Sequence, residues 1–358
     1  MILFDTTKAR TGGRRRSGLD RVSERLRQSL GAAAQEVVWE AGLRDARTRD
    51  AVRAGAEDAF VTSELFSGTE RPGFTQFLEA RSCTFAAIFH DAIPLKHPHI
   101  TWPQSVARHP GYMKLLARFD QVFAVSESSR SDLLGFWKWQ GIEQPPPVEV
   151  VALGADFSAA PRVTSRAATV NSAGVQNSDT PKLLCVGIIE PRKNQDFLLD
   201  VCADLWTEGL RFELHLVGRV NPHFGALTIS RLKALRRGWP GLLHFHEAAS
   251  DTMVARLYAT TRAGVFPTIA EGCGLPLLES LWLGVPCVCS DLPVLRENAD
   301  PGGCLVVPVN NRAAWKDALR RIVTDDTLHA QLVTEAVSRS LPTWSDAARS
   351  LAAALLER

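Results

Sequence analysis

Apolar and polar positions in the C-terminal half of the chain follow the pattern of strands that alternate with helices. Residues 263–268 form a short apolar run, and the loop 269–274 after it holds one carboxylate between small residues. Residues 275–283 are apolar at helical spacing, and 285–290 form a second apolar run. A strand, loop, helix and strand in this order indicate a parallel sheet, and ligands bind beyond the carboxyl ends of such strands. We therefore expect the loop to lie at a binding site.

The same alternation continues through most of the chain and favours an α/β protein. The expected strands are 2–4, 37–39, 59–62, 82–89, 120–125, 148–152, 182–189, 212–218, 242–246 and 304–308. The expected helices are 19–30, one that Ser126 or Ser128 caps, one after Lys193, a short one ending at Ala259, 313–323, 327–340, and a last one that Ser345 caps.

The length of the chain and a linker-like segment predict two domains. At 358 residues the chain is long for a single core. Residues 158–180 are rich in Ser, Thr, Asn and Ala without a clear period, which is typical of a linker. We expect an N-terminal domain at 1–157, this linker, and a second domain at 181–342.

Composition is that of an ordinary globular protein. The chain is 45% hydrophobic and 22% charged, and its net charge of +2 gives no reason to expect a nucleic-acid partner. No apolar stretch reaches the length of a membrane span, and the N-terminus lacks the core of a signal peptide. A cytoplasmic location is expected.

Cysteines and histidines do not predict a metal site. The seven cysteines mostly lie in apolar runs, and we expect buried free thiols in a reducing compartment. Cys287 and Cys289 share one face of a strand, where core packing is expected. His244 and His246 also share a face, but no third ligand stands near them, so no metal is expected. The other histidines include His97, His99 and His109, which look like loop residues without a role.

The loop before the helix at 275–283 carries the candidate chemistry. Gly272 and Gly274 leave backbone N–H groups just before the helix, whose N-terminus attracts anions. Glu271 lies in the loop, and Glu279 lies just over one turn inside the helix. Two carboxylates so placed can hold hydroxyls of a nucleotide sugar while the N–H groups bind its phosphate. An ordinary glycine-rich turn with a solvated Glu279 is the alternative.

The segment EGCGLPLLES, followed by GVPCVCSD, resembles the Glu-x7-Glu signature of the retaining GT-B glycosyltransferases of family four, the glycosyl transferases group 1. The resemblance covers nearly the whole chain, best over 181–310 and more thinly over 1–80. It implies two Rossmann-like domains with parallel sheets that face each other across a cleft, with the last helix, 343–358, packed back on the N-terminal domain. The donor-binding residues that it implies around the loop are Gly272, Cys273, Gly274, Leu275 and Glu279.

A second motif, GIIEPRKNQD, follows the strand at 182–189. The family keeps a lysine at the position of Lys193, which implies that Lys193 neutralises the leaving diphosphate. A second base usually follows the strand glycine, where this chain has Ile188, so Arg192 is expected to replace it. A solvated cation pair is the alternative, but two cations at a helix start oppose the helix dipole.

Two N-terminal motifs resemble the family as well. FHDAIPLKHP implies that His90, at the end of a strand, contacts the donor sugar and the reacting phosphate; a structural histidine oriented by Asp91 is the alternative. SGLDRV implies that Gly18 faces the donor phosphates, with Arg21 nearby. A solvated basic loop is the alternative, and binding to an anionic membrane surface is a second use for it.

Together these motifs imply a hexosyltransferase. It would move a mannose- or glucose-type hexose from a nucleotide diphosphate sugar to a glycan or lipid-linked acceptor, with retention, in bacterial surface polysaccharide synthesis. In the family the strand that ends at His246 cradles the nucleotide base. The absence of an Asp-x-Asp motif implies metal independence, and no cofactor is expected beyond the sugar nucleotide. A catalytically silent GT-B subunit, and an epimerase-type or phosphorylase enzyme on the same fold, stay open as alternatives.

Overall fold

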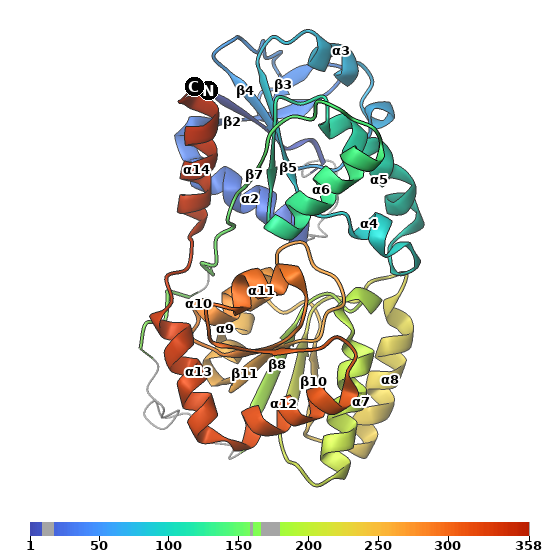
Figure 1. Cartoon of the computed structure of the whole chain (residues 1–358), viewed down its shortest axis with the longest axis vertical. Coiled ribbons are helices and arrows are strands. Elements are labelled where there is room, and N and C mark those ends of the chain that lie inside the picture. Colours follow the sequence, from blue (N-terminus) through green and yellow to red (C-terminus); the bar gives the residue numbers. More distant parts are fainter. Residues whose placement is uncertain (9–17, 158–159, 166–179, 358) are drawn as a thin grey trace. The chain divides into compact units, whose positions relative to one another are not determined.

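The computed structural model describes residues 1–8, 18–157, 160–165 and 180–357 (Figure 1). The chain forms two compact units: unit 1 comprises Met1–Gly154 and Pro342–Arg358, and unit 2 comprises Ala155–Leu341. Each unit is a mainly parallel sheet with helices on both faces, which confirms the expectation of two Rossmann-like domains. The expected linker falls largely on residues outside the described ranges.

Unit 1 is built on a seven-stranded sheet in the order β3-β2-β1-β4-β5-β6-β7. Every neighbouring pair is parallel except β2 and β3. The strands β1, β4 and β6 are buried along their whole length, as their continuous apolar runs predict. The strands are β1 (Ile2–Asp5), β2 (Ala34–Trp39), β3 (Leu43–Asp45), β4 (Ala59–Thr62), β5 (Thr84–Phe89), β6 (Gln121–Ala124) and β7 (Val148–Val150).

Helices cover both faces of this sheet. An aromatic cluster joins α3, α5 and α6 to one face, while α2 and α14 pack against each other beside the sheet (Figure 1). The helix α14 therefore returns the end of the chain to the N-terminal unit. The helices are α2 (Gly18–Leu30), α3 (Phe74–Glu79), α4 (Ile93–Lys96), α5 (Pro103–Leu116), α6 (Glu127–Trp139) and α14 (Trp344–Leu356).

Unit 2 is built on a six-stranded, fully parallel sheet in the order β10-β9-β8-β11-β12-β13. This is the doubly wound order, in which the chain reverses direction across the sheet between β8 and β11. The strands are β8 (Lys182–Val186), β9 (Glu213–Val217), β10 (Leu243–His246), β11 (Ala263–Phe266), β12 (Cys287–Ser290) and β13 (Cys304–Val307).

Two hydrophobic layers hold this sheet. One core cluster joins the sheet to α7, α8 and α12, and two others join it to α9, α10 and α11. Cys287 and Cys289 both lie in the second layer, so their expected role in core packing is confirmed. The helices are α7 (Gln195–Thr207), α8 (Gly225–Gly238), α9 (Asp251–Thr260), α10 (Leu275–Trp282), α11 (Pro293–Ala299), α12 (Arg312–Thr324) and α13 (Asp326–Ser338).

Of the helix caps expected at Ser126 and Ser345, the structure confirms the first and not the second. Ser126 caps α6 as expected, since its side chain accepts a hydrogen bond from the Ser129 N–H. The expected cap at Ser345 is wrong. Thr343 caps α14 instead, in a capping box with Asp346, because the carboxylate three residues later completes the reciprocal pair of hydrogen bonds.

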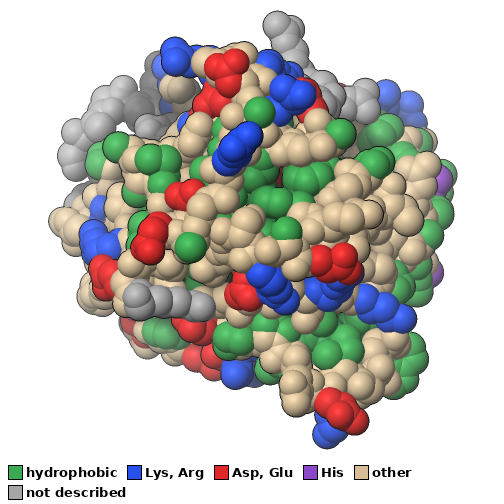
Figure 2. Space-filling view, turned by 90° about the horizontal axis from the view of Figure 1, so that it is seen from above, with side chains coloured by type: hydrophobic (Ala, Val, Ile, Leu, Met, Phe, Trp, Pro, Cys, Tyr) green, Lys and Arg blue, Asp and Glu red, His purple; other side chains and the backbone are tan. Residues whose placement is uncertain are grey.

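Charges of both signs are mixed at the surface. On the face that Figure 2 draws, acidic and basic side chains are interspersed rather than gathered by sign. That face therefore carries no strong field of one sign, in agreement with the net charge of +2. Among the described residues, every helix is too short or too polar to cross a lipid bilayer.

The strands β8 and β9 end in two glycines that nearly touch. A Cβ atom added at Gly218 would lie 2.0 Å from the carbonyl oxygen of Gly187 and 2.6 Å from its carbonyl carbon. These are backbone atoms of the neighbouring strand, so they cannot turn away as a flexible side chain can. Only glycine allows the two strand ends to approach so closely, which brings the loops that follow them to one place.

We predict that Gly218→Ala lowers the free energy of unfolding of unit 2 by about 3 kcal/mol, because the added methyl group forces the strand ends apart. The melting temperature falls accordingly. Gly238→Ala is the matched control, since nothing lies within 4 Å of its added Cβ at the end of α8. Differential scanning calorimetry of both variants measures the difference. Equal melting temperatures for Gly218→Ala and the unsubstituted chain would contradict this packing argument.

Candidate active site

The candidate site lies where the sheet of unit 2 reverses its winding. The neighbouring strands β8 and β11 are parallel, so their carboxyl ends meet at one edge. The 3-10 turn Pro191–Lys193 follows β8, and the loop with Thr268 and Glu271 follows β11. In doubly wound sheets this switch point is where ligands bind. The two motifs that sequence analysis singled out therefore converge there.

The structure brings Lys193, Arg192 and Glu271 into direct contact. Lys193 Nζ lies 2.5 Å from Glu271 Oε1, and Arg192 Nη1 lies 3.0 Å from Glu271 Oε2. The Lys193 and Glu271 side chains are only 13% and 10% exposed. The alternative of two cations lying free in solvent is therefore excluded, because both hold the same partly buried carboxylate.

Arg192 also ties the two loops together. Its guanidinium donates to Glu190 Oε1 and to the Ala270 carbonyl, each at 3.0 Å. Its own carbonyl accepts hydrogen bonds from Thr268 Oγ1 and the Ile269 N–H, both at 2.9 Å. These bonds give Arg192 a positioning role, since they hold the Glu271 loop against the turn after β8.

Lys193 is aimed by the turn that carries it. Its aliphatic stem runs over Gly187, where an added Cβ would meet the Lys193 Cδ and Cε atoms at 3.4 Å. The next residue, Asn194, adopts the left-handed conformation and closes the turn. Its Nδ2 donates to the Pro267 carbonyl and to Asn310 Oδ1. The turn that carries Lys193 is therefore fixed against the loops that follow β11 and β13.

Helix α10 begins beside this ion pair. Gly274 caps it with a φ of 82°, a conformation that favours glycine, and an added Cβ there would lie 2.6 Å from Leu295 Cδ2. Gly272, Cys273 and Leu275 are half-buried around it. Asn298 Nδ2 donates to the Cys273 carbonyl and anchors the loop. The first N–H groups of a helix lack acceptors within the helix, so this N-terminus can bind an anion.

Glu279 lies inside α10 and is buried, with 4% of its surface exposed. The alternative of a solvated Glu279 is therefore wrong. Its predicted contact with a ribose stays a prediction.

Glu271 is held in its charged form. Burial alone would raise its pKa, but the ion pairs with Lys193 and Arg192 and the hydrogen bonds to the carboxylate outweigh burial and lower the pKa from 4.5 to about 2. At neutral pH the carboxylate is therefore ionised and accepts hydrogen bonds without donating any.

His90 lies in unit 1, at the carboxyl end of β5, and is buried. Its Nε2 donates to the Ser63 carbonyl at 3.0 Å, and its own carbonyl accepts from Ser129 Oγ at 2.7 Å. Burial lowers the pKa of the imidazole, which keeps it neutral. The ring is oriented by Ser63, and its contact with a donor sugar stays a prediction.

Two other predicted donor ligands are Gly18 of unit 1 and His246 of unit 2. Gly18 is the exposed first residue of α2, and the glycines and arginines before it lie outside the described residues. Arg21 lies in the first turn of α2. His246 ends β10, and its Nε2 lies 3.0 Å from His215 Nδ1.

A buried charged network that no sequence motif predicts lies at the corresponding position of unit 1, where β1 and β4 end. Arg71 is 4% exposed and pairs with Asp5 Oδ2 at 2.6 Å and with Glu64. Thr62 Oγ1 donates to the same Asp5 oxygen at 2.7 Å. No spacing signal links these residues, since Asp5 and Arg71 stand 66 positions apart.

His109 was also misjudged. It is not a loop residue, because it lies within α5 and is 1% exposed. Its Nε2 donates to the Asp91 carbonyl at 2.9 Å, which fixes the backbone just after His90. The proline inside this helix, Pro110, hides the helical pattern around His109.

Known proteins are similar to this chain in sequence and in fold. A profile of the family described as glycosyl transferases group 1 matches residues 180–325. The serotype-specific mannosyltransferase WbdA of Escherichia coli is 28% identical over 254 residues, which are 68% of this chain and 30% of that protein. The O-antigen chain mannosyltransferase B of Escherichia coli is 35% identical over 145 residues, which are 40% of this chain and 37% of that protein. The matches thus span about a third of the length of these relatives.

Among solved structures, sucrose-phosphate synthase from Thermosynechococcus elongatus has a TM-score of 0.74 at 16% identity, over 98% of this chain and 96% of that one. At this identity the likeness shows the GT-B fold. The match to the family profile adds to this likeness, because it includes the loops that carry Lys193 and Glu271. Residues 180–325 of the chain therefore match the family of the glycosyl transferases group 1.

Proposed function

We propose that the chain transfers a mannose-type hexose from a nucleotide diphosphate sugar to a hydroxyl group of a glycan or lipid-linked acceptor, with retention at the anomeric carbon, in polysaccharide synthesis. The observation that carries this proposal is the contact between Lys193 and Glu271, 2.5 Å apart at the switch point of unit 2. The mannosyltransferases among the relatives support the choice of sugar.

In the proposed reaction the bond between the anomeric carbon and the diphosphate oxygen breaks, and its electron pair leaves with the diphosphate. The acceptor oxygen forms the new bond on the same face of the sugar, and its proton passes to the departing phosphate oxygen. Negative charge therefore develops on the diphosphate. Lys193, Arg192 and the N–H groups at Gly272, Cys273, Gly274 and Leu275 would stabilise it.

Glu271 would hold the sugar while staying ionised. A pKa of about 2 leaves no proton on the carboxylate at neutral pH, so it accepts hydrogen bonds from sugar hydroxyls and does not act as a general acid. Lys193 and Arg192 already hold this carboxylate in place. In this proposal their positive charge would face the position at which the sugar meets its diphosphate, so one cluster would serve both parts of the donor.

The remaining roles in the proposal follow the family resemblance. Glu279 would bind the ribose, and the backbone near His246 would bind the base. His90 and Gly18 belong to unit 1, and their contacts with sugar and phosphate are likewise proposed. Metal-independent chemistry and a cytoplasmic location, with contact to an anionic membrane, complete the proposal.

Removing either charge of the pair tests the mechanism. We predict that Lys193→Ala and Glu271→Ala each reduce the rate of sugar transfer by about a hundredfold or more, because each removes an interaction that the transition state needs. Lys233→Ala is the matched control, since Lys233 is an exposed lysine of α8. The readout is release of nucleoside diphosphate from GDP-mannose or UDP-glucose with an acceptor mixture. Full activity in either variant removes that residue from the mechanism, and an inactive unsubstituted chain favours a silent subunit.

A thermal-shift panel tests donor choice. We predict that one nucleotide sugar or its nucleoside diphosphate raises the melting temperature, since ligand at a hundred times its dissociation constant adds about 2.7 kcal/mol to native-state stability. The panel contains GDP-mannose, UDP-glucose and the corresponding diphosphates. No shift with any diphosphate at millimolar concentration would contradict the proposed binding mode.

Stability should depend on pH through Glu271. Because the folded-state pKa is lowered from 4.5 to about 2, the carboxylate stabilises the folded state fully above pH 4.5 and loses this contribution as pH falls toward 2. We predict that the gap in unfolding free energy between the unsubstituted chain and Glu271→Gln shrinks by about 1.5 kcal/mol from pH 7 to pH 3.5. Urea denaturation at both pH values measures the gap, and a gap that does not change with pH would show that Glu271 is not held by its cations.

A further inference from the structure

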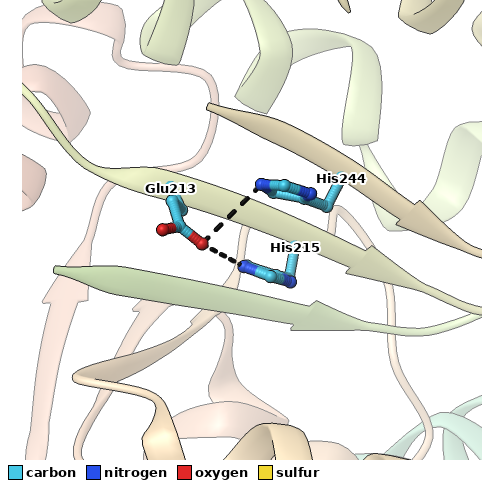
Figure 3. Close-up of side chains that lie close together, drawn as sticks. All are labelled: Glu213, His215 and His244. Carbon is cyan, nitrogen blue, oxygen red and sulfur yellow. Dashed lines mark hydrogen bonds and ion pairs between the residues drawn. The ribbon is translucent and has the colours of Figure 1, made fainter. Parts of the chain in front are cut away.

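A second cluster of ionisable side chains lies in unit 2, on the strands β9 and β10. Glu213, His215 and His244 converge on one side of these strands (Figure 3). Glu213 Oε2 lies 2.9 Å from His215 Nε2 and 3.7 Å from His244 Nε2. One ligand atom from each residue lies within 4.8 Å of the other two. The cluster thus contains three metal-binding groups at the spacing of a single ion.

The sheet explains why these three side chains meet. Glu213 and His215 are two residues apart on β9, so they point to the same face of the sheet. His244 is the direct neighbour of His215 in the parallel register between β9 and β10. Their rings stack at a centroid distance of 4.4 Å. The expectation that no third ligand stands near His244 is therefore wrong, because the missing ligands come from the adjacent strand.

We propose that Glu213, His215 and His244 bind a divalent transition-metal ion of the Zn²⁺ type. Two imidazoles and one carboxylate form a three-ligand set that Zn²⁺ accepts with a fourth position for water. Backbone pairing fixes the separation of two of the ligands, so little order must be imposed when the ion binds. Glu213 and His215 are 14% and 9% exposed, while His244 is 33% exposed and gives the ion a way in.

His246 supplies the outer partner that a metal-bound histidine needs. With the ion on Nε2 of His215, the ring carries its proton on Nδ1. His215 Nδ1 lies 3.0 Å from His246 Nε2 and would donate a hydrogen bond to it. A hydrogen bond of this kind fixes the tautomer and orientation of the ligating ring. The His246 ring stacks on His215 with an interplanar angle of 5°, which restrains it further.

Contacts within the protein compete with the ion, and the shortest is the hydrogen bond between His215 Nε2 and Glu213 Oε2 at 2.9 Å, which the ion would replace. Lys182 Nζ lies 4.0 Å from Glu213 Oε2, and His244 Nε2 lies 2.9 Å from the Gly241 carbonyl. A bound ion displaces the proton from His244 Nε2 and so replaces its hydrogen bond to Gly241. Lys182 and His244 are both partly exposed, so each can turn away. The ion must therefore replace these contacts when it binds, and we expect a dissociation constant in the micromolar range or lower.

The proposed site is structural and does not depend on the proposed transfer reaction. Glu213 is the first residue of β9 and His244 is the second residue of β10. Lys193 and Glu271, by contrast, follow the carboxyl ends of their strands. A metal here would fasten the edge strand β10 to β9.

Metal titration of the full chain tests the proposal. The chain is stripped with EDTA, and ZnCl₂ is titrated in competition with a chromophoric chelator. We expect one Zn²⁺ per chain, with at least tenfold weaker binding in His244→Ala and in Glu213→Gln. His223→Ala, an exposed histidine of the same unit, is the matched control and should bind as the unsubstituted chain does. Circular dichroism establishes that each variant is folded.

Cobalt supplies a second measurement that requires no variant. Co²⁺ bound to two imidazoles and a carboxylate should give intense visible bands of four- or five-coordinate metal, which Zn²⁺ then removes. Failure of the unsubstituted chain to bind one Zn²⁺, or a Co²⁺ spectrum that remains that of the hydrated ion, would overturn the proposal. Equal Zn²⁺ affinity in the unsubstituted chain and folded His244→Ala would overturn it as well.

Discussion

The contact between a carboxylate and two cations at the switch point of unit 2 is the interaction on which the candidate site depends. Glu271 is largely removed from water, which by itself disfavours its charge. Lys193 and Arg192 offset the cost of burying this charge, and they can reach Glu271 because β8 and β11 are neighbours in the sheet. Breaking one partner of such a pair leaves a buried charge uncompensated, so the pair specifies the geometry of both loops.

This pairing also constrains how a donor could bind. The positive charge of Lys193 is already directed at Glu271, and Arg192 is further engaged by Glu190. An arriving diphosphate would share Lys193 with Glu271, adding a third anion to a cluster that holds two cations and the carboxylates of Glu271 and Glu190. The N-terminus of α10 would then supply the additional positive potential. The proposed site therefore needs the ion pair and the helix together.

Much of this architecture follows from local sequence. The secondary structure from β11 through the Glu271 loop to α10 and β12 could be predicted, because apolar periodicity, a glycine cap and a second apolar run all agree. The contact between Lys193 and Glu271 could not be predicted from their spacing in the sequence. Only the family resemblance implied that both residues bind the same donor molecule. Thr343 replaced Ser345 as a cap because the position of Asp346 decides which residue completes the capping box.

Contacts that depend on which strands are neighbours could not be predicted from the sequence. Arg71 meets Asp5 only because β1 and β4 adjoin, and His215 meets His244 only because β9 and β10 adjoin. No periodicity along one segment reveals such pairs, since register is a property of two segments. His109 was missed for a local reason, because Pro110 disguises its helix.

The central claim of the proposal is that Lys193 binds the diphosphate of the nucleotide sugar. Calorimetric titration of the unsubstituted chain and of Lys193→Ala, each with a nucleoside diphosphate and the matching monophosphate, measures this directly. We predict that the unsubstituted chain prefers the diphosphate by about tenfold or more, and that Lys193→Ala loses this preference while monophosphate affinity stays nearly constant. An undiminished preference in Lys193→Ala would contradict the account.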